Sequence, residues 1–318
     1  MRRMNLIDKV RSTQKSRDAE GPFELYVTRT PGYLWAVLFR KLGVHPVAVT
    51  LMGIVIGAAS GWFFYSADVR TNLIGMFLLV WANWYDCADG QLARMTGKRT
   101  LIGRILDGFA GDVWFFFIYL FICLRLQQEA IPFTDVKWGW GIWLIGAWSG
   151  LRCHGRQCAI GDYYRNVHMY FELGRERAEL DETAALREQY REMKWCSADW
   201  FHKLYLFFYI RYTGSQEAQA PAVVQMKHRL EESYPNGLPT PLCEEFCKYS
   251  RPLMPLTNIL TFDTRVIVLF LTTALGHPWI YFIFESTVLE AIRYYLIGRH
   301  NALCRHIVSN YINREDVE

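Results

Sequence analysis

Apolar stretches of about 20 residues alternate along this chain with short, highly charged ones. A helix needs roughly 20 apolar residues to cross the hydrocarbon core, so repeated stretches of that length are typical of polytopic membrane proteins. The average composition hides this segregation, because 52% of the 318 residues are hydrophobic and 21% are charged. The expected fold class is an all-α polytopic membrane protein with six transmembrane helices, an N-terminal interfacial amphipathic helix and a cytosolic helical insert between spans four and five.

The same pattern divides the chain into four segments. Residues 1–44 are expected to form a cytosolic tail and the interfacial helix, which Pro31-Gly32 should break. Residues 45–164 hold spans one to four, at about 45–66, 71–93, 100–123 and 138–161. Residues 165–250 form the cytosolic helical insert, and 251–318 hold spans five and six, at about 256–276 and 278–298, with a cytosolic tail.

Lysine and arginine predict the orientation. They are frequent in the N-terminal tail, in the 94–104 turn, in the long segment between spans four and five, and in the C-terminal tail. By the positive-inside rule both termini and the 94–104 turn are cytosolic. The net charge of +4, without a basic pattern interleaved with stacking aromatics, predicts no nucleic-acid partner.

Acidic residues gather where the second predicted span ends and the third begins. Asp86 and Asp89 are one turn apart on one helix face, and Asp107 follows a short basic turn. Since a short turn makes the two helices antiparallel, their acidic faces can meet. Carboxylates are costly near hydrocarbon, and a shared divalent cation with oxygen ligands is the best reason for them.

Small residues accompany these carboxylates. Gly90, Ala93 and Gly103 have almost no side chain, so a bulky ligand can lie close to the backbone there. Arg94 offers a fixed positive fork for phosphate groups. The pattern therefore favours a site for a metal ion and a pyrophosphate.

This run resembles the signature of the CDP-alcohol phosphotransferase family, D-x2-D-G-x2-A-R-x8-G-x3-D-x3-D. Seven positions match in type and spacing: Asp86, Asp89, Gly90, Ala93, Arg94, Gly103 and Asp107. The resemblance implies an enzyme that transfers a substituted phosphate group from a CDP-linked donor, with release of CMP, in phospholipid synthesis. It implies that Asp86, Asp89 and Asp107 ligate two Mg²⁺ or Mn²⁺ ions, that all seven residues bind CDP, and that the protein is a homodimer. The apolar spans place the protein in the lipid bilayer, and the positive-inside rule opens the active site to the cytosol.

One position departs from the signature. Its last aspartate, the proposed base of the family, is expected at position 111, where this chain has Gly111 followed by Asp112. In a regular helix Asp112 is turned about 140° from Asp107. A one-residue bulge would return Asp112 to the site face as the catalytic base; another base or a catalytically inert relative are the alternatives.

The substrates are left open between two arrangements. Six predicted spans favour CDP-diacylglycerol with a polar alcohol such as inositol, inositol phosphate or glycerol phosphate, by resemblance to family members. Arg152 and Arg156, one turn apart, suit a phosphorylated acceptor. The alternative is a CDP-linked small alcohol (ethanolamine, choline or inositol type) with a lipid acceptor such as diacylglycerol or ceramide.

Two further classes compete with this family. A UbiA-type prenyltransferase also holds magnesium diphosphate between aspartate-bearing helices, and a transporter would line a cation path with carboxylates. Other polar residues fit packing roles: Gly53, Gly57 and Gly61 permit close helix contact, and Glu290 with Arg293 predicts an internal ion pair. Asp263 and Arg265, which begin the fifth predicted span, are equally compatible with substrate binding and with an interfacial polar pair.

Overall fold

The computed structural model describes residues 5–11, 13, 16, 18, 21, 23–175, 180–195 and 200–312. This part of the chain is helical apart from its loops and one isolated β-bridge between Ala130 and Lys137, which confirms the all-α class. Two compact units form, one from residues 1–155 and 265–286 and the other from 156–264 and 287–318. Each unit is described by itself.

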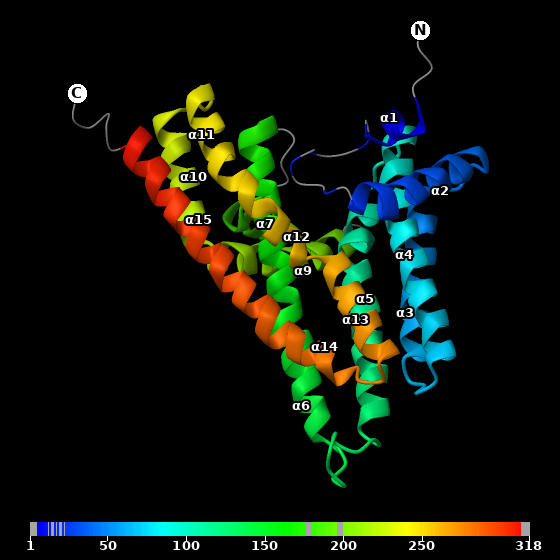
Figure 1. Cartoon of the computed structure of the whole chain (residues 1–318). Coiled ribbons are helices and arrows are strands. Elements are labelled where there is room, and N and C mark those ends of the chain that lie inside the picture. Colours follow the sequence, from blue (N-terminus) through cyan, green and yellow to red (C-terminus); the bar gives the residue numbers. More distant parts are fainter. Residues whose placement is uncertain are drawn as a thin grey trace. The chain divides into compact units, whose positions relative to one another are not determined.

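The first unit contains the helices from α1 to η2, together with most of α13, all of α14 and the start of η5 (Figure 1). Its elements are α1 (Leu6–Arg11), η1 (Glu24–Arg29), α2 (Thr30–Lys41), α3 (Pro46–Phe63), α4 (Val69–Thr96), α5 (Leu101–Leu126), α6 (Gly141–Ala147), η2 (Trp148–His154), most of α13 (Phe262–Ala274), α14 (Trp279–Phe284) and the start of η5 (Glu285–Leu289). Segments η1, η2 and η5 are π-helical.

The second unit carries the predicted insert and the last long helix. Its elements are α7 (Gly155–Leu173), α8 (Thr183–Glu192), α9 (Trp200–Gln219), α10 (Pro221–Ser233), α11 (Thr240–Ser250), the 3-10 turn η4 (Arg251–Leu253), α12 (Met254–Ile259) and α15 (Glu290–Tyr311). Arg293 donates to Glu290 with an Nη2–Oε1 distance of 2.5 Å, which confirms the predicted ion pair.

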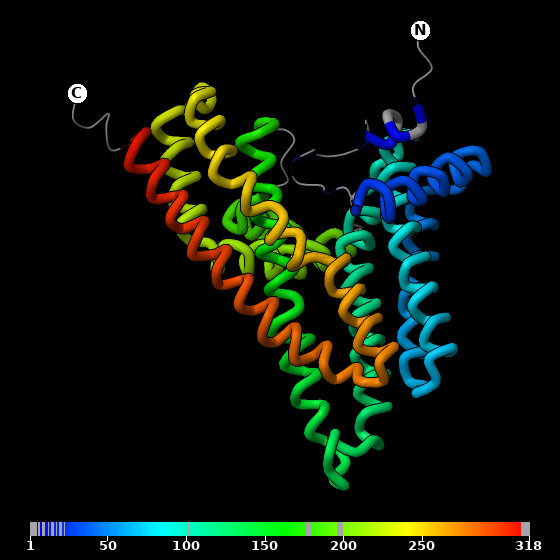
Figure 2. The backbone as a smooth tube through the Cα atoms, viewed as in Figure 1, coloured from blue at the N-terminus to red at the C-terminus, as the bar shows by residue number. Residues whose placement is uncertain are grey.

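Helix α3 packs along both α4 and α5, as the tube in Figure 2 shows for α3 and α4. Its glycines allow this closeness. A Cβ built on Gly57 would lie 2.2 Å from Trp114 Cδ1, and one on Gly61 would lie 2.8 Å from the backbone carbonyl carbon of Phe117. No side chain fits at these positions, so α3 fixes α5 at backbone distance. The predicted packing role of these two glycines is confirmed.

The expected break at Pro31-Gly32 is wrong. The chain stays helical from η1 into α2, because Pro31 occupies the first turn of α2, where a missing N–H is tolerated. The Thr30 N–H reaches back to the Leu25 carbonyl across the π-helical segment. A Cβ on Gly32 would lie 2.9 Å from Cys87 Cβ, so α2 also packs tightly on α4.

Among the described residues, three helical stretches are long and apolar enough to cross a membrane. They are Pro46–Phe63, Ile102–Leu126 and Thr240–Ala274, and they overlap the first, third and fifth predicted spans, although the last of them begins well before the predicted fifth span. The helix α4 carries Asp86, Asp89 and Arg94 in its second half. The fourth and sixth predicted spans are each divided by a π-helical segment. The six-span arrangement stays a prediction.

Candidate metal centre

Three aspartates from two helices converge in the first unit. Asp86 and Asp89 come from α4 and Asp107 from α5, and one carboxylate oxygen of each lies within 4.8 Å of the others. Asp89 is buried, with 4% of its surface exposed. Asp86 is half-buried and Asp107 is exposed, so the cluster is open on the α5 side. The predicted meeting of the two acidic faces is found.

The turn between α4 and α5 is defined by helix caps. Helix α4 ends at Gly97, whose φ of 68° is the left-handed conformation that favours glycine. Helix α5 begins at Thr100, whose hydroxyl accepts a hydrogen bond of 3.0 Å from the Gly103 N–H. Because only Lys98 and Arg99 lie between these caps, the two acidic helix ends must start close together.

The opposite face of α4 is anchored in an apolar cluster. Trp35 of α2 stacks on Trp81 and meets Tyr85 edge-on, with ring centroids 5.9 Å and 5.1 Å apart. The buried members of this cluster are Ala36, Phe39, Val49, Tyr85, Ala88 and Leu92. Tight packing on this side fixes the rotation of α4, so that Asp86 and Asp89 face α5.

The donor set fits a divalent metal ion. Three carboxylates supply the hard oxygen ligands that Mg²⁺ and Mn²⁺ prefer. Asp89 Oδ2 is buried and has no hydrogen-bond partner. A buried anionic oxygen without a partner is unfavourable, and a cation bound by the three carboxylates would compensate it.

The small residues beside the cluster leave backbone accessible. A Cβ built on Gly90 would lie 3.4 Å from an Arg94 Nη1 atom, so the guanidinium group folds back over Gly90. A Cβ on Gly103 would lie 3.1 Å from Thr100 Oγ1, the atom that caps α5. Ala93 follows on α4 and is half-buried. Beside the carboxylates there are thus three residues with little or no side chain, and one arginine that supplies a positive charge.

The one-residue bulge expected near Asp112 is absent. Helix α5 is α-helical from Leu101 to Leu126, so Asp112 keeps its regular register, about 140° around the helix from Asp107. Glycines make a bulge possible but do not impose one, and α5 is held straight by its packing on α3. Asp112 is exposed, and Cβ atoms built on Gly108 and Gly111 would meet nothing within 4 Å.

The two predicted acceptor arginines fall in different units. Arg152 lies in η2, with its guanidinium carbon 5.8 Å from the centre of the Trp148 ring. Its Nη1 atom is buried and has no hydrogen-bond partner. Arg156 belongs to the second unit, where its carbonyl accepts a hydrogen bond of 3.2 Å from Gln219 Nε2.

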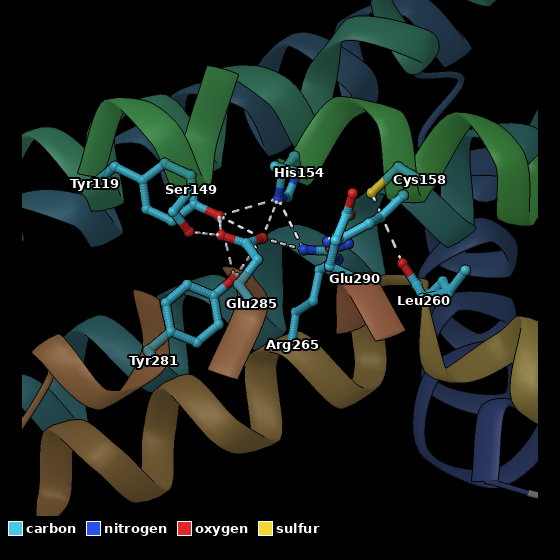
Figure 3. Close-up of polar contacts among 10 residues, drawn as sticks. Tyr119, Ser149, His154, Cys158, Leu260, Arg265, Tyr281, Glu285 and Glu290 are labelled. Atoms are coloured by element: carbon cyan, nitrogen blue, oxygen red, sulfur yellow. Dashed lines mark hydrogen bonds and ion pairs between the residues drawn. The ribbon is translucent and has the colours of Figure 1, made fainter. Parts of the chain in front are cut away.

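A second polar constellation in the first unit is one that the sequence reasoning largely missed (Figure 3). Glu285 is fully buried, and the Tyr119 hydroxyl donates to its two oxygens at 2.7 and 2.8 Å. Arg265 and Ser149 also donate to this carboxylate, and His154 Nδ1 lies 3.0 Å from it. Arg265 is buried and pairs with Glu285, a partner that the sequence analysis did not name. An ionisable residue inside the apolar 279–289 run was the available signal.

This buried network links four separate stretches of the first unit. Tyr119 comes from α5, Ser149 and His154 from η2, Arg265 from α13 and Glu285 from η5. Two of these stretches are π-helical, and a π-helical turn shifts the side chains that follow it to a new face. Because its hydrogen bonds join α5 to η2, α13 and η5, we call this network the clamp on α5.

Comparison with known proteins supports the resemblance drawn from the sequence. Residues 43–152 match the family model described as CDP-alcohol phosphatidyltransferase. The matched stretch covers α3, α4 and α5, including every member of the acidic cluster. No curated protein and no solved structure matches the chain.

Proposed function

We propose that the acidic centre of α4 and α5 is the active site of a CDP-alcohol phosphotransferase that works in phospholipid synthesis. The observation that carries this proposal is the convergence of Asp86, Asp89 and Asp107 around a buried oxygen without a partner, within the matched stretch. The family supplies the donor class, a CDP-linked alcohol, and the reaction class, transfer of a phosphate-containing group.

Each residue of the centre has a distinct role in this proposal. Asp86, Asp89 and Asp107 would hold two Mg²⁺ or Mn²⁺ ions. When bound, the ions neutralise the pyrophosphate of the donor and polarise its phosphoryl oxygens. Gly90, Ala93 and Gly103 let the cytidine diphosphate lie against the backbone, and Arg94 binds phosphate oxygens. Together these seven residues would position the donor with its β-phosphorus open to attack.

Transfer then needs a proton acceptor at the incoming hydroxyl. The acceptor oxygen forms a bond to the β-phosphorus while the bond from that phosphorus to the bridging oxygen breaks, and CMP leaves with the bonding electron pair. Asp112 is proposed to take the hydroxyl proton. Asp112 is exposed on α5, about 140° around the helix from Asp107, so the acceptor hydroxyl would have to approach it from that side of the helix.

The favoured substrates are CDP-diacylglycerol and a polar, phosphorylated alcohol. The support is Arg152, whose buried Nη1 lacks a partner and would gain one from a phosphate oxygen. Arg156, which belongs to the second unit, stays a predicted acceptor contact. Accordingly, Arg152→Gln should raise the KM for inositol phosphate or glycerol phosphate at least about tenfold and leave the KM for the CDP donor unchanged.

The membrane arrangement belongs to the same proposal. Six spans, cytosolic termini and a cytosolic acidic centre would place the site where nucleotides are made. A homodimer is proposed from the family. Cysteine labelling from either side of sealed vesicles would test the orientation.

The deciding experiment is an assay of CMP release by the purified protein. Radiolabelled CDP-diacylglycerol, CDP-ethanolamine or CDP-choline is incubated with a panel of polar and lipid acceptors, with Mg²⁺, Mn²⁺ or a chelator. We expect CMP release from one donor, dependent on metal and on one acceptor class. Consumption of a prenyl diphosphate without CMP, or ion flux that survives Asp89→Asn, would replace the proposal with a prenyltransferase or a transporter.

A further inference from the structure

Helix α9 exposes a row of large aromatic side chains, although it lies in the charged insert. Trp200 is 52% exposed, Phe207 40%, Phe208 44% and Tyr212 37%. Trp200, Phe207 and Arg211 are seven and four residues apart and share one helix stripe. We call these four exposed aromatics the aromatic face of α9. Contiguous exposed aromatics of this kind mark an interaction surface in soluble parts of proteins.

The rotation of α9 is fixed by polar contacts near its C-terminal end. Gln216 Nε2 donates to the Ala159 carbonyl at 3.1 Å, and Gln219 Nε2 donates to the Arg156 carbonyl at 3.2 Å. Arg293 of α15 donates to Gln219 Oε1 at 2.8 Å. Since these buried amides hold α9 against α7 and α15, the aromatic face cannot turn inward without breaking them.

Within α9 itself the charges beside the aromatic face are positive, while Asp162 of α7 accepts a hydrogen bond of 2.9 Å from the Tyr212 hydroxyl. Residues 200–212 contain no aspartate or glutamate, and their two permanent cations are Lys203 and Arg211. Arg211 lies over the Phe207 ring, with its guanidinium carbon 5.7 Å from the ring centre. Lys203 Nζ lies 5.4 Å from the centre of the Trp195 ring, which fixes another half-exposed tryptophan beside the helix.

We propose that α9 lies on the membrane–water interface, with its aromatic face inserted among lipid headgroups. Tryptophan and tyrosine favour that layer, and arginine beside them reaches lipid phosphates. A basic, aromatic helix of this kind binds in the interface plane rather than across it. The described residues agree, because α9 is not among the three stretches able to span a bilayer. The inference needs only the bilayer, so it stands apart from the proposed catalysis.

Fluorescence of single tryptophans tests this docking in the full-length protein. The chain is reconstituted in vesicles of phosphatidylcholine and phosphatidylglycerol, in which the phosphatidylcholine is brominated either near the headgroup or near the chain end. The difference between wild type and Trp200→Phe isolates the emission of Trp200. We expect this difference emission to lose most of its intensity with shallow bromines and much less with deep ones. Trp62→Phe, in the candidate span α3 and 63% exposed, is the positive control for lipid contact.

A charge-insertion variant gives an independent result. Phe207→Asp with Phe208→Asp should shift the Trp200 emission to the red and remove its quenching by brominated lipid. The matched control, Ala184→Asp with Ala185→Asp, places the same charges on exposed positions of α8 and should leave the quenching unchanged. Trp200 emission quenched by aqueous iodide but not by either brominated lipid overturns the proposal. Dependence of the emission on protein density instead of lipid bromination also overturns it, in favour of a second copy.

Discussion

Replacing Asp89 by asparagine separates two effects of the acidic centre on stability: repulsion among its carboxylates, and stabilisation by a bound metal ion. Asparagine keeps the size of the side chain and removes one negative charge from a cluster whose oxygens lie within 4.8 Å. Two full charges at that distance repel by about 3 kcal/mol at an effective dielectric constant of 20, and solvent at the exposed Asp107 reduces this value. Without metal, the Asp89→Asn protein should therefore be at least as stable as wild type.

With metal present, the wild-type protein should be more stable than Asp89→Asn. At one hundred times the dissociation constant, a bound ion stabilises the wild-type protein by about 2.7 kcal/mol. Loss of a ligand should weaken metal binding by at least about 100-fold, which leaves about 0.4 kcal/mol at the same concentration. Turnover should fall below detection, because the donor pyrophosphate loses its counter-charge.

The assay is unfolding of the purified protein in detergent, with and without Mn²⁺, alongside CMP release. Asp135→Asn, at an exposed loop position between α5 and α6, is the matched control and should behave as wild type in both measurements. If Asp89→Asn keeps the full metal-induced stabilisation, then the cluster is not the metal centre and the reasoning is wrong.

Three further changes test other parts of the structure. Gly57→Ala should destabilise the protein by about 1–3 kcal/mol in denaturant unfolding, because its Cβ would lie 2.2 Å from Trp114, whereas Gly108→Ala, with nothing within 4 Å, should not. Asp112→Asn should slow CMP release severely while CDP binding, followed by calorimetry, stays within about twofold of wild type; an unchanged rate would remove Asp112 from the mechanism. The hydrogen bond and charge of Lys227 lower the pKa of Glu182, so this pair stabilises the protein above the unfolded-state pKa of Glu182, and the contribution is lost as pH falls through its lower folded-state pKa. Glu182→Gln should lower the free energy of unfolding by no more than about 1 kcal/mol at neutral pH and should remove the part of its decrease at low pH that this pair causes. Unfolding of the two proteins over a range of pH measures both effects.

The acidic centre was predictable because its geometry is local. Helical periodicity places Asp86 and Asp89 on one face, and a short capped turn brings α5 beside them, so no long-range information was needed. The glycine row of α3 was predictable for the same reason, since close packing requires small residues at one-turn spacing.

What the sequence concealed depends on register and on distant partners. The π-helical segments η2 and η5 change which side chains face inward, and no local pattern announces them. They bring His154 and Glu285 together across more than a hundred residues of chain. The bulge expected at Asp112 failed for a related reason: glycine permits a distortion, but packing on α3 decides whether the helix adopts it.

The Glu285 network and the acidic cluster of the first unit differ in whether their polar groups are satisfied by protein partners. Around Glu285 the described donors and acceptors satisfy one another, and such a network holds helices in place without needing a ligand. Around Asp89 three carboxylates face one another with a buried oxygen left over, and a bound cation would compensate that oxygen. Because α5 contributes Tyr119 to the first and Asp107 to the second, the clamp fixes the same helix that presents the ligand. Weakening the clamp by Tyr119→Phe should therefore lower metal affinity at the distant cluster, although Tyr119 itself binds no metal.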